Sequence, residues 1–152
     1  GETFTLYKFR SMIASSESDG RPALCSGADD RRLTCVGRFL REHHLDELPQ
    51  LWNVLKGEMS FVGPRPEVER YVRLYTPYQR QVLLVRPGIT DYASIAYRNE
   101  NDLLAGAEDP EKTYIEQIMP DKIELNMKYL REISPLADIK LILKTVAAVV
   151  KG

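Results

Sequence analysis

Two adjacent carboxylates, Asp46 and Glu47, are the first residues of the chain whose types and spacing indicate chemistry. A carboxylate can attack phosphorus as a nucleophile, and a neighbouring carboxylate can hold a magnesium ion. Both lie at the predicted start of a helix, where the helix dipole favours the ionised form that either role needs. Acidic residues ahead of a proline in a first turn, here Pro49, also commonly cap helices, so capping stays open as the alternative.

Arg65 stands between Pro64 and Pro66, in a segment too rich in proline for a helix or a central strand. A guanidinium on such a stiff loop is preorganised to bind phosphate oxygens in a bidentate manner. The alternative is an exposed arginine in a turn, without a functional role. Further cations near predicted turns would suit a diphosphate if the fold gathers them: Lys8, Arg10, Arg38, Arg41, Arg86 and Arg98.

The sequence lacks the residues that several other kinds of functional site require. His43 and His44 are adjacent, so they do not share a helix face, and the absence of a third histidine argues against zinc. The chain has no glycine-rich phosphate loop, dinucleotide fingerprint or Ser-His-Asp signature, which disfavours ordinary kinases and dehydrogenases. We expect Cys25 and Cys35 to be free thiols, with Cys35 packed as a small apolar residue.

Local patterns in the first half of the chain predict the elements that would position these residues. An aromatic, β-prone stretch predicts a strand with Lys8 and Arg10 on one face. A later helix begins at the acidic pair and ends before Gly57. In order, we expect a strand at 3–10, a mobile surface loop at 15–30, a short amphipathic helix at 34–41, a helix at 45–55, an apolar run at 59–62 and a rigid loop at 63–66.

The residue pattern of the second half of the chain predicts mainly helices, separated by turns that contain proline. We expect helices near 67–75 and 77–84, a β-prone stretch at 89–97, and helices near 111–118, 121–132 and 136–151. No internal repeat or second domain boundary is evident. The predicted fold is therefore α+β and predominantly helical, with a few short strands in a single compact domain over 1–152.

The last predicted helix has one broad apolar face and a row of lysines along another. The apolar positions are Leu136, Ile139, Leu143, Val146, Ala147 and Val150. Most amphipathic helices pack this face inward, and we favour that interpretation. A helix lying in a membrane interface is the alternative.

Charge and hydropathy exclude some partners. The chain carries 21 basic and 22 acidic residues, so no overall field favours nucleic acid. No run of about 18 apolar residues predicts a simple membrane-spanning helix. Because the chain begins with Gly1 rather than methionine, we expect it to be part of a longer protein.

Five blocks in order resemble the bacterial sugar transferase family, the monotopic polyprenyl-phosphate phosphoglycosyl transferases. The blocks are YKFRSM at 7–12, DRRLT with VGRFLR at 30–34 and 36–41, LDELPQLWNVLKGEMS at 45–60, VGPRP at 62–66 and RPGIT at 86–90. They cover nearly the whole chain, and their common order is far more specific than any single block.

The resemblance implies a two-step reaction that initiates assembly of a surface glycan such as exopolysaccharide, capsule or O-antigen. Asp46 would attack the β-phosphorus of a UDP-sugar and expel UMP, leaving a phosphosugar-aspartyl intermediate for transfer to undecaprenyl phosphate. Glu47 would bind Mg²⁺. By the same resemblance, the anionic site is lined by Arg41, Arg65 and Arg98 with Lys8 close by, and Arg86 is a further substrate-binding candidate.

The family also carries a re-entrant membrane segment ahead of the strand with Lys8, and this sequence lacks it. The resemblance therefore implies a catalytic portion that is membrane-associated in its parent protein, at inner-membrane lipid on the cytoplasmic face. We leave open whether the protein forms a homodimer. The alternative function is a non-catalytic module that binds nucleotide sugars or docks assembly enzymes, which would have no physical need for a nucleophile beside a metal ligand.

Overall fold

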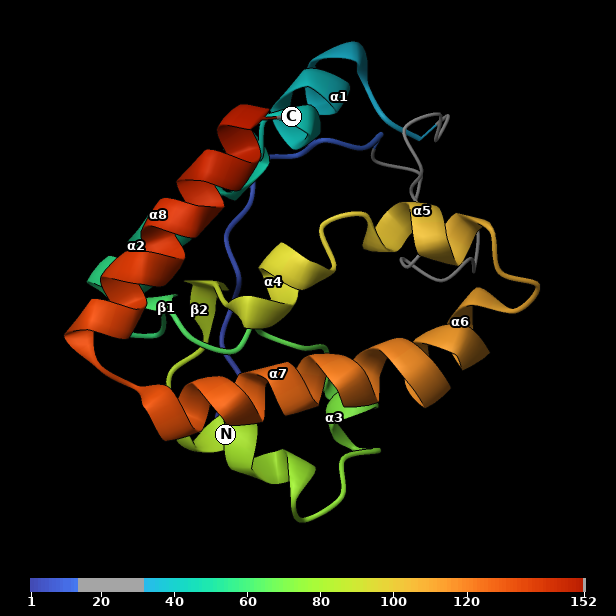
Figure 1. Ribbon diagram of the computed structural model, residues 1–152. Helices are drawn as coiled ribbons and strands as arrows, with labels where there is room; N and C mark the ends of the chain where they lie inside the picture. Colours follow the sequence, from blue (N-terminus) through green and yellow to red (C-terminus); the bar gives the residue numbers. More distant parts are fainter. Residues whose placement is uncertain (14–31, 152) are drawn as a thin grey trace.

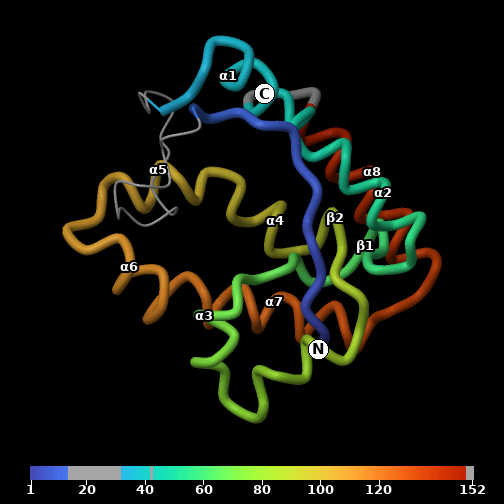
Figure 2. Tube along the Cα trace, turned by 180° about the vertical axis from the view of Figure 1, so that it is seen from behind, coloured from blue at the N-terminus to red at the C-terminus, as the bar shows by residue number. Residues whose placement is uncertain are grey.

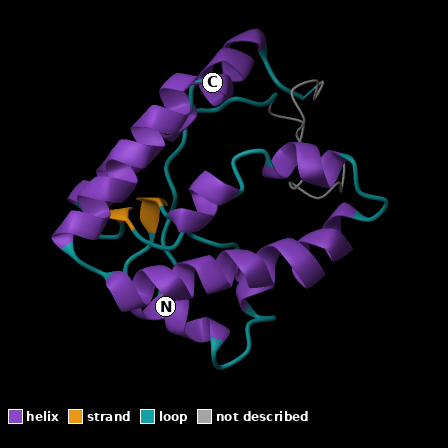
Figure 3. Ribbon diagram, in the orientation of Figure 1, coloured by secondary structure: helices purple, strands orange, loops and turns teal. Residues whose placement is uncertain are grey.

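The computed structural model describes residues 1–13 and 32–151, so the expected loop at 15–30, with Cys25, lies outside the described residues. Most of the described chain is helical, as predicted, around one small sheet (Figure 3). Helix α7 (Met119–Glu132) runs along the lower edge of Figure 1 and helix α8 (Pro135–Lys151) along the left edge, with the sheet near the corner where they meet.

The sheet consists of two short parallel strands, β1 (Ser60–Val62) and β2 (Gly88–Thr90). Ser60 pairs with Gly88 and Val62 pairs with Thr90. The backbone around the strands approaches closely, because a Cβ atom on Gly88 would lie 2.1 Å from the Gly63 nitrogen. Glycine at position 88 therefore lets the loop that carries Arg65 pack directly on β2.

The predicted helix at 34–41 is confirmed as α1 (Cys35–Glu42), whose N-cap Thr34 accepts a hydrogen bond from the Gly37 N–H. Cys35 is exposed on this helix, so the prediction that it packs in the core was wrong. The N-cap position places Cys35 at the first turn, ahead of the residues that face the domain.

The single helix predicted at 45–55 is divided into a 3-10 turn, η2 (Leu45–Glu47), and helix α2 (Gln50–Leu55). His44 adopts a left-handed backbone with φ of 54°, which turns the chain between α1 and η2. Pro49, which lacks an N–H, stands at the N-cap of α2, where that donor is not needed. The helix ends before Gly57, as predicted, where φ is +77°.

The predicted strand at 3–10 is extended but belongs to neither strand of the sheet. Figure 2 shows this segment crossing the molecule from the neighbourhood of α7 to α1. Its partners are the Asn53 side chain and the carbonyl of Asp46, together with a single antiparallel bridge between Met12 and Leu33. The predicted strand at 3–10 was therefore wrong, because the segment binds α2 and η2 instead of pairing with a neighbouring strand.

The remaining elements follow the predicted order, with shorter helices than expected. They are α3 (Glu69–Val72), η3 (Gln79–Leu84), α4 (Tyr92–Ala96), α5 (Glu100–Ala105), α6 (Pro110–Thr113) and the π-helical turn η4 (Tyr114–Ile118), which leads into α7. The β-prone stretch at 89–97 is a strand only as far as Thr90, because Asp91 caps α4 and starts a helix there. Helix α5 was not predicted.

Two apolar clusters hold these elements together. The larger cluster joins α3, η4 and α7, and its Tyr71 and Tyr114 rings lie with centroids 4.9 Å apart. The smaller cluster, formed by Val62, Tyr129 and Leu141, ties β1 to α7 and α8. The sheet is therefore fixed on the two long helices, and the loop after β1 is fixed with it.

Helix α8 packs on the sheet by the face opposite to the one we expected. Leu141 is buried, and the Thr145 hydroxyl lies 2.6 Å from the Thr90 hydroxyl. The expected inward residues are mostly exposed: Leu136, Ile139, Leu143 and Val146 at 55–79%, with Ala147 also exposed, whereas the Val150 side chain is not described. The inward-packing prediction was wrong for this face. None of the helices in the described ranges is long and apolar enough to cross a bilayer.

Candidate active site

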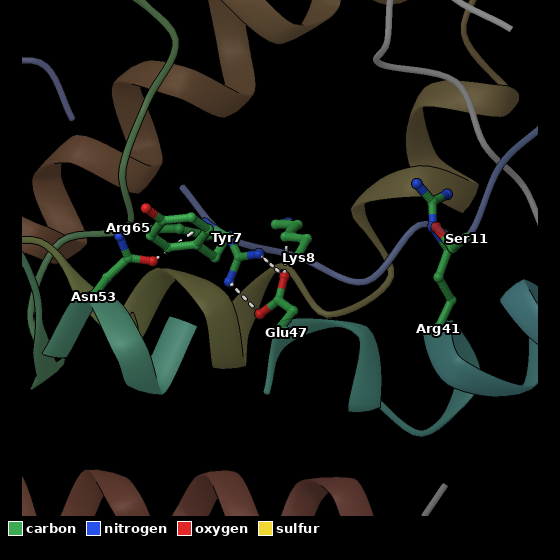
Figure 4. A network of polar contacts seen from close by, with 7 residues as sticks. All are labelled: Tyr7, Lys8, Ser11, Arg41, Glu47, Asn53 and Arg65. Carbon is green, nitrogen blue, oxygen red and sulfur yellow. Dashed lines mark hydrogen bonds and ion pairs between the residues drawn. The ribbon is translucent and has the colours of Figure 1, made fainter. Parts of the chain in front are cut away.

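A cluster of ion pairs surrounds the Glu47 carboxylate, which η2 presents at its end (Figure 4). Arg65 binds this carboxylate with both terminal nitrogens, and the Nη1 to Oε2 distance is 3.0 Å. Lys8 Nζ donates to Glu47 Oε1 at 3.0 Å. Three segments far apart in the sequence thus bring two cations and one carboxylate together. That these cations bind an anionic substrate stays a prediction.

The charges in this cluster are strongly coupled. Burial by itself would raise the pKa of Glu47, but the hydrogen bonds and charges of Arg65 and Lys8 lower it to about 2. Burial would lower the pKa of Arg65, but the hydrogen bond and charge of Glu47, together with the charges of Asp91 and Asp46, raise it. Glu47 is therefore ionised and Arg65 charged at any physiological pH.

Asp46 precedes Glu47 in η2, and its side chain is buried with 8% of the residue exposed. Its backbone carbonyl accepts a hydrogen bond from the Phe9 N–H at 2.9 Å. The Asp46 carboxylate lies close enough to Arg65 for its charge to raise the pKa of that guanidinium. A shielded carboxylate beside a fixed cation can attack an electrophilic phosphorus, since the cation offsets the repulsion between two anions.

Asp91 fixes the loop that carries Arg65, and sequence analysis missed this residue. Its buried carboxylate accepts the Arg65 backbone N–H at 3.1 Å through Oδ2 and the Ser94 N–H at 2.5 Å through Oδ1. Asp91 is thus both the N-cap of α4 and the anchor of the loop. An aspartate directly ahead of a short helical run was the signal that could have revealed the cap.

Arg41 lies on α1, and in the close view of Figure 4 it is drawn apart from the Glu47 cluster, next to Ser11. Its Nε donates to the Ser11 hydroxyl at 3.1 Å. Ser11 packs tightly on this helix, because a Cβ atom on Gly37 would lie 1.9 Å from the Ser11 carbonyl oxygen. The contact fixes the direction of Arg41, and within residues 1–13 and 32–151 its two terminal nitrogens donate to no acceptor.

The other predicted cations have different contacts. Arg86 lies against Gly57, at the far end of α2. Arg98 donates from Nη1 to the carbonyl of Ala148 in the last turns of α8. Arg10 and Arg38 are exposed. Within residues 1–13 and 32–151, no hydrogen bond or ion pair joins these arginines to the Glu47 cluster, so a direct role in anion binding stays a prediction for Arg86 and Arg98.

The acidic pair suits a magnesium ion shared with a substrate. Mg²⁺ is commonly held by one or two carboxylates together with substrate phosphates, rather than by an all-protein cage. In the described part of the chain, no three acidic, histidine or cysteine side chains gather into a protein-only metal site. Glu47, which is ionised, is the residue that would supply a magnesium ligand beside a bound diphosphate, and this stays a prediction.

Comparisons with known proteins identify relatives along the full chain. A model of the bacterial sugar transferase family matches residues 1–152. The chain is 42% identical over 149 residues to the uncharacterized sugar transferase EpsL of Bacillus subtilis (strain 168). This alignment covers 98% of the chain and 64% of that protein. It is 36% identical over 152 residues to UDP-N-acetylgalactosamine-undecaprenyl-phosphate N-acetylgalactosaminephosphotransferase of Aeromonas hydrophila. That alignment covers 98% of the chain and 32% of the relative.

A third relative is UDP-glucose:undecaprenyl-phosphate glucose-1-phosphate transferase of Escherichia coli (strain K12), with 40% identity over 151 residues, 96% of the chain and 29% of that protein. The chain thus spans 29–64% of the length of these three relatives. The relatives with named activities are sugar phosphotransferases that act on undecaprenyl phosphate, and their names give different sugars. On the full-length match, the chain belongs to the bacterial sugar transferase family.

Proposed function

We propose that this chain is the catalytic part of an enzyme that moves a sugar phosphate from a UDP-sugar to undecaprenyl phosphate and releases UMP. The observation that carries the proposal is the buried Asp46 beside the Glu47 carboxylate, which Arg65 and Lys8 hold in place. The names of the relatives support this reaction class. The identity of the sugar is left open, because those names differ in it.

The proposed chemistry has two displacements at one phosphorus. An oxygen of the Asp46 carboxylate forms a bond to the β-phosphorus while the bond from that phosphorus to the bridging oxygen breaks, and the electron pair leaves with UMP. An oxygen of undecaprenyl phosphate then attacks the same phosphorus, and the Asp46 carboxylate leaves. Each bond formed replaces one bond broken, so no oxidant or further reactant is required.

The cations of the site offset the negative charge that accumulates in both steps. Arg65 is fixed through its backbone by Asp91 and through its side chain by Glu47, so it presents a preorganised positive charge. Arg41 offers two further donors from α1. Glu47 would hold a magnesium ion, which when bound would supply additional charge neutralisation.

We also propose that the domain works at the cytoplasmic face of the inner membrane, with α8 against lipid. Leu136, Ile139, Leu143 and Val146 form an exposed apolar row on this helix. Lys140 and Lys144 are exposed beside the row. Apolar side chains flanked by lysines fit an anionic lipid surface, where the lysines bind headgroups and the apolar row enters the interface.

The alternative function is a module that binds nucleotide sugars without reacting. The intact acidic pair beside Arg65 favours the enzyme, because binding alone needs no buried carboxylate next to the diphosphate. The test is UMP release from a panel of UDP-sugars, with Mg²⁺ and undecaprenyl phosphate, by the full-length protein and by Asp46→Asn. We expect release that Asp46→Asn abolishes. UDP-sugar binding without release by the folded wild-type protein would favour the binding module.

A further inference from the structure

We propose that Asn53 is a positioning residue, which holds the N-terminal segment in the register that delivers Lys8 to Glu47. This role rests on the proposed function, because the position of Lys8 matters for activity only if the site binds a diphosphate. The inference comes from the N-terminal segment, which is extended yet pairs with neither strand of the sheet.

The Asn53 side chain takes the place of a neighbouring strand. The residue lies in α2 and is 0% exposed. Its Oδ1 accepts the Tyr7 backbone N–H at 3.1 Å, and its Nδ2 donates to the Thr5 carbonyl at 2.8 Å. Alternate residues of an extended segment direct their backbone groups to the same edge, so one amide side chain satisfies two positions that a strand would otherwise pair.

The same edge of the segment continues to the acidic pair. The Phe9 N–H donates to the Asp46 carbonyl at 2.9 Å, two residues beyond the contact with Tyr7. Lys8 therefore lies between two backbone anchors, one on Asn53 and the other on Asp46. From this position its ammonium reaches Glu47 Oε1 at 3.0 Å. Fixing the backbone on both sides removes part of the entropy cost of ordering a long lysine side chain.

Glu58 completes the arrangement from the end of α2. Its Oε2 accepts the second Nδ2 proton of Asn53 at 2.7 Å, and its Oε1 accepts from Lys56 at 3.0 Å. The hydrogen bond from Asn53, followed by the one from Lys56, lowers the pKa of Glu58. An ionised acceptor fixes which side of the Asn53 amide carries the nitrogen, and hence which backbone groups of the segment it can bind.

The residue type follows from this geometry. An aspartate at 53 could accept from Tyr7 but could not donate to Thr5, and its charge would lie beside that of Glu58. A leucine has the same number and branching of side-chain heavy atoms, although it is somewhat larger, and it has neither function. Asn53→Leu therefore removes the backbone contacts while keeping the branched shape of the side chain.

The first test measures the anchoring directly in this chain, by amide hydrogen exchange of Tyr7 and Phe9. In Asn53→Leu we expect both amides to exchange about tenfold faster or more, because loss of one net hydrogen bond is worth about that factor. Tyr7→Pro removes the same N–H and leaves Asn53 in place, although it also removes the contact of the Tyr7 ring with Lys56 at the C-cap of α2. It should speed exchange at Phe9 likewise. Tyr129→Phe, a core variant that loses hydrogen bonds to Val62 and Asp138, is the control and should leave these two amides protected.

Unchanged exchange at Phe9 in both Asn53→Leu and Tyr7→Pro would overturn the proposal. If Asn53→Leu fails to fold, Tyr7→Pro alone decides it, since that substitution lies outside α2. Neither measurement depends on enzymatic activity.

The second test is a double-mutant cycle on UMP release by the full-length protein in membranes. In the wild-type background, Lys8→Met should lower kcat/KM about tenfold, the cost of losing one charge-assisted contact. In the Asn53→Leu background the same change should matter less than about twofold, because Lys8 is already displaced. In the Tyr129→Phe background it should keep its full effect. A tenfold loss in all three backgrounds would overturn the positioning role, whereas absence of UMP release by the wild type would overturn the proposed function.

Discussion

The ion pairs at Glu47 make a quantitative prediction about stability and pH. The pKa of this carboxyl is lowered from 4.5 to about 2, and its side chain is only 16% exposed, so solvent screening is small. A shift of that size corresponds to about 3 kcal/mol of folding stability. Because the folded pKa lies below the unfolded one, the contribution is complete above the unfolded value and disappears as the pH falls through about 2.

The perturbation that isolates this contribution is Glu47→Gln, which resembles the protonated glutamate at every pH. We expect the wild type to be more stable than Glu47→Gln by about 3 kcal/mol at neutral pH, and this difference to shrink steadily below about pH 5. Urea unfolding of both proteins over a series of pH values measures it. Glu116→Gln, at an exposed glutamate, is the control and should change stability by less than about 0.5 kcal/mol. A difference that stays constant from neutral pH to about pH 3, or grows on acidification, would refute this reasoning.

Three further predictions follow from single contacts. Arg65→Lys should lower the rate of UMP release by about a hundredfold without unfolding the domain, because lysine loses the bidentate contact; a loss below about threefold would count against Arg65 as the fixed cation. Leu143→Asp should reduce co-sedimentation with anionic phospholipid vesicles by about tenfold, while Leu84→Asp, at a residue that is 82% exposed on η3, should not; equal binding by both variants would argue against α8 as the lipid face. Gly37→Ala should destabilise the domain by about 2 kcal/mol in urea unfolding, because its Cβ would lie 1.9 Å from the Ser11 carbonyl oxygen, and an unchanged midpoint would mean that α1 is free to move.

Features with local causes could be predicted from the sequence. Thr34 caps α1, Gly57 ends α2, and the prolines around Arg65 make the loop that presents it. The ion pairs of Glu47 with Arg65 and Lys8 were not predicted, because the sequence suggested Glu47 as a magnesium ligand and the two cations as ligands of an anionic substrate. The cap, the helix end and the proline loop follow from backbone preferences within a few residues, whereas the Glu47 ion pairs join distant segments.

Features that depend on distant partners could not be predicted. The segment at 3–10 has the composition of a strand, but nothing local shows that the Asn53 side chain would be its partner. Helix α8 has the expected period, yet the period does not tell which of two apolar faces meets the sheet, and Leu141 rather than Leu143 is buried. The contact of Arg98 with Ala148 likewise depends on where α8 packs.

The central claim is that Asp46 is the nucleophile, and trapping its product tests that claim most directly. The full-length protein would be incubated with Mg²⁺ and a UDP-sugar that supports UMP release, without undecaprenyl phosphate, and its peptides analysed by mass spectrometry. We expect a sugar-phosphate adduct on Asp46 that disappears when undecaprenyl phosphate is added. An adduct on Glu47, or turnover that continues in Asp46→Asn, would contradict it.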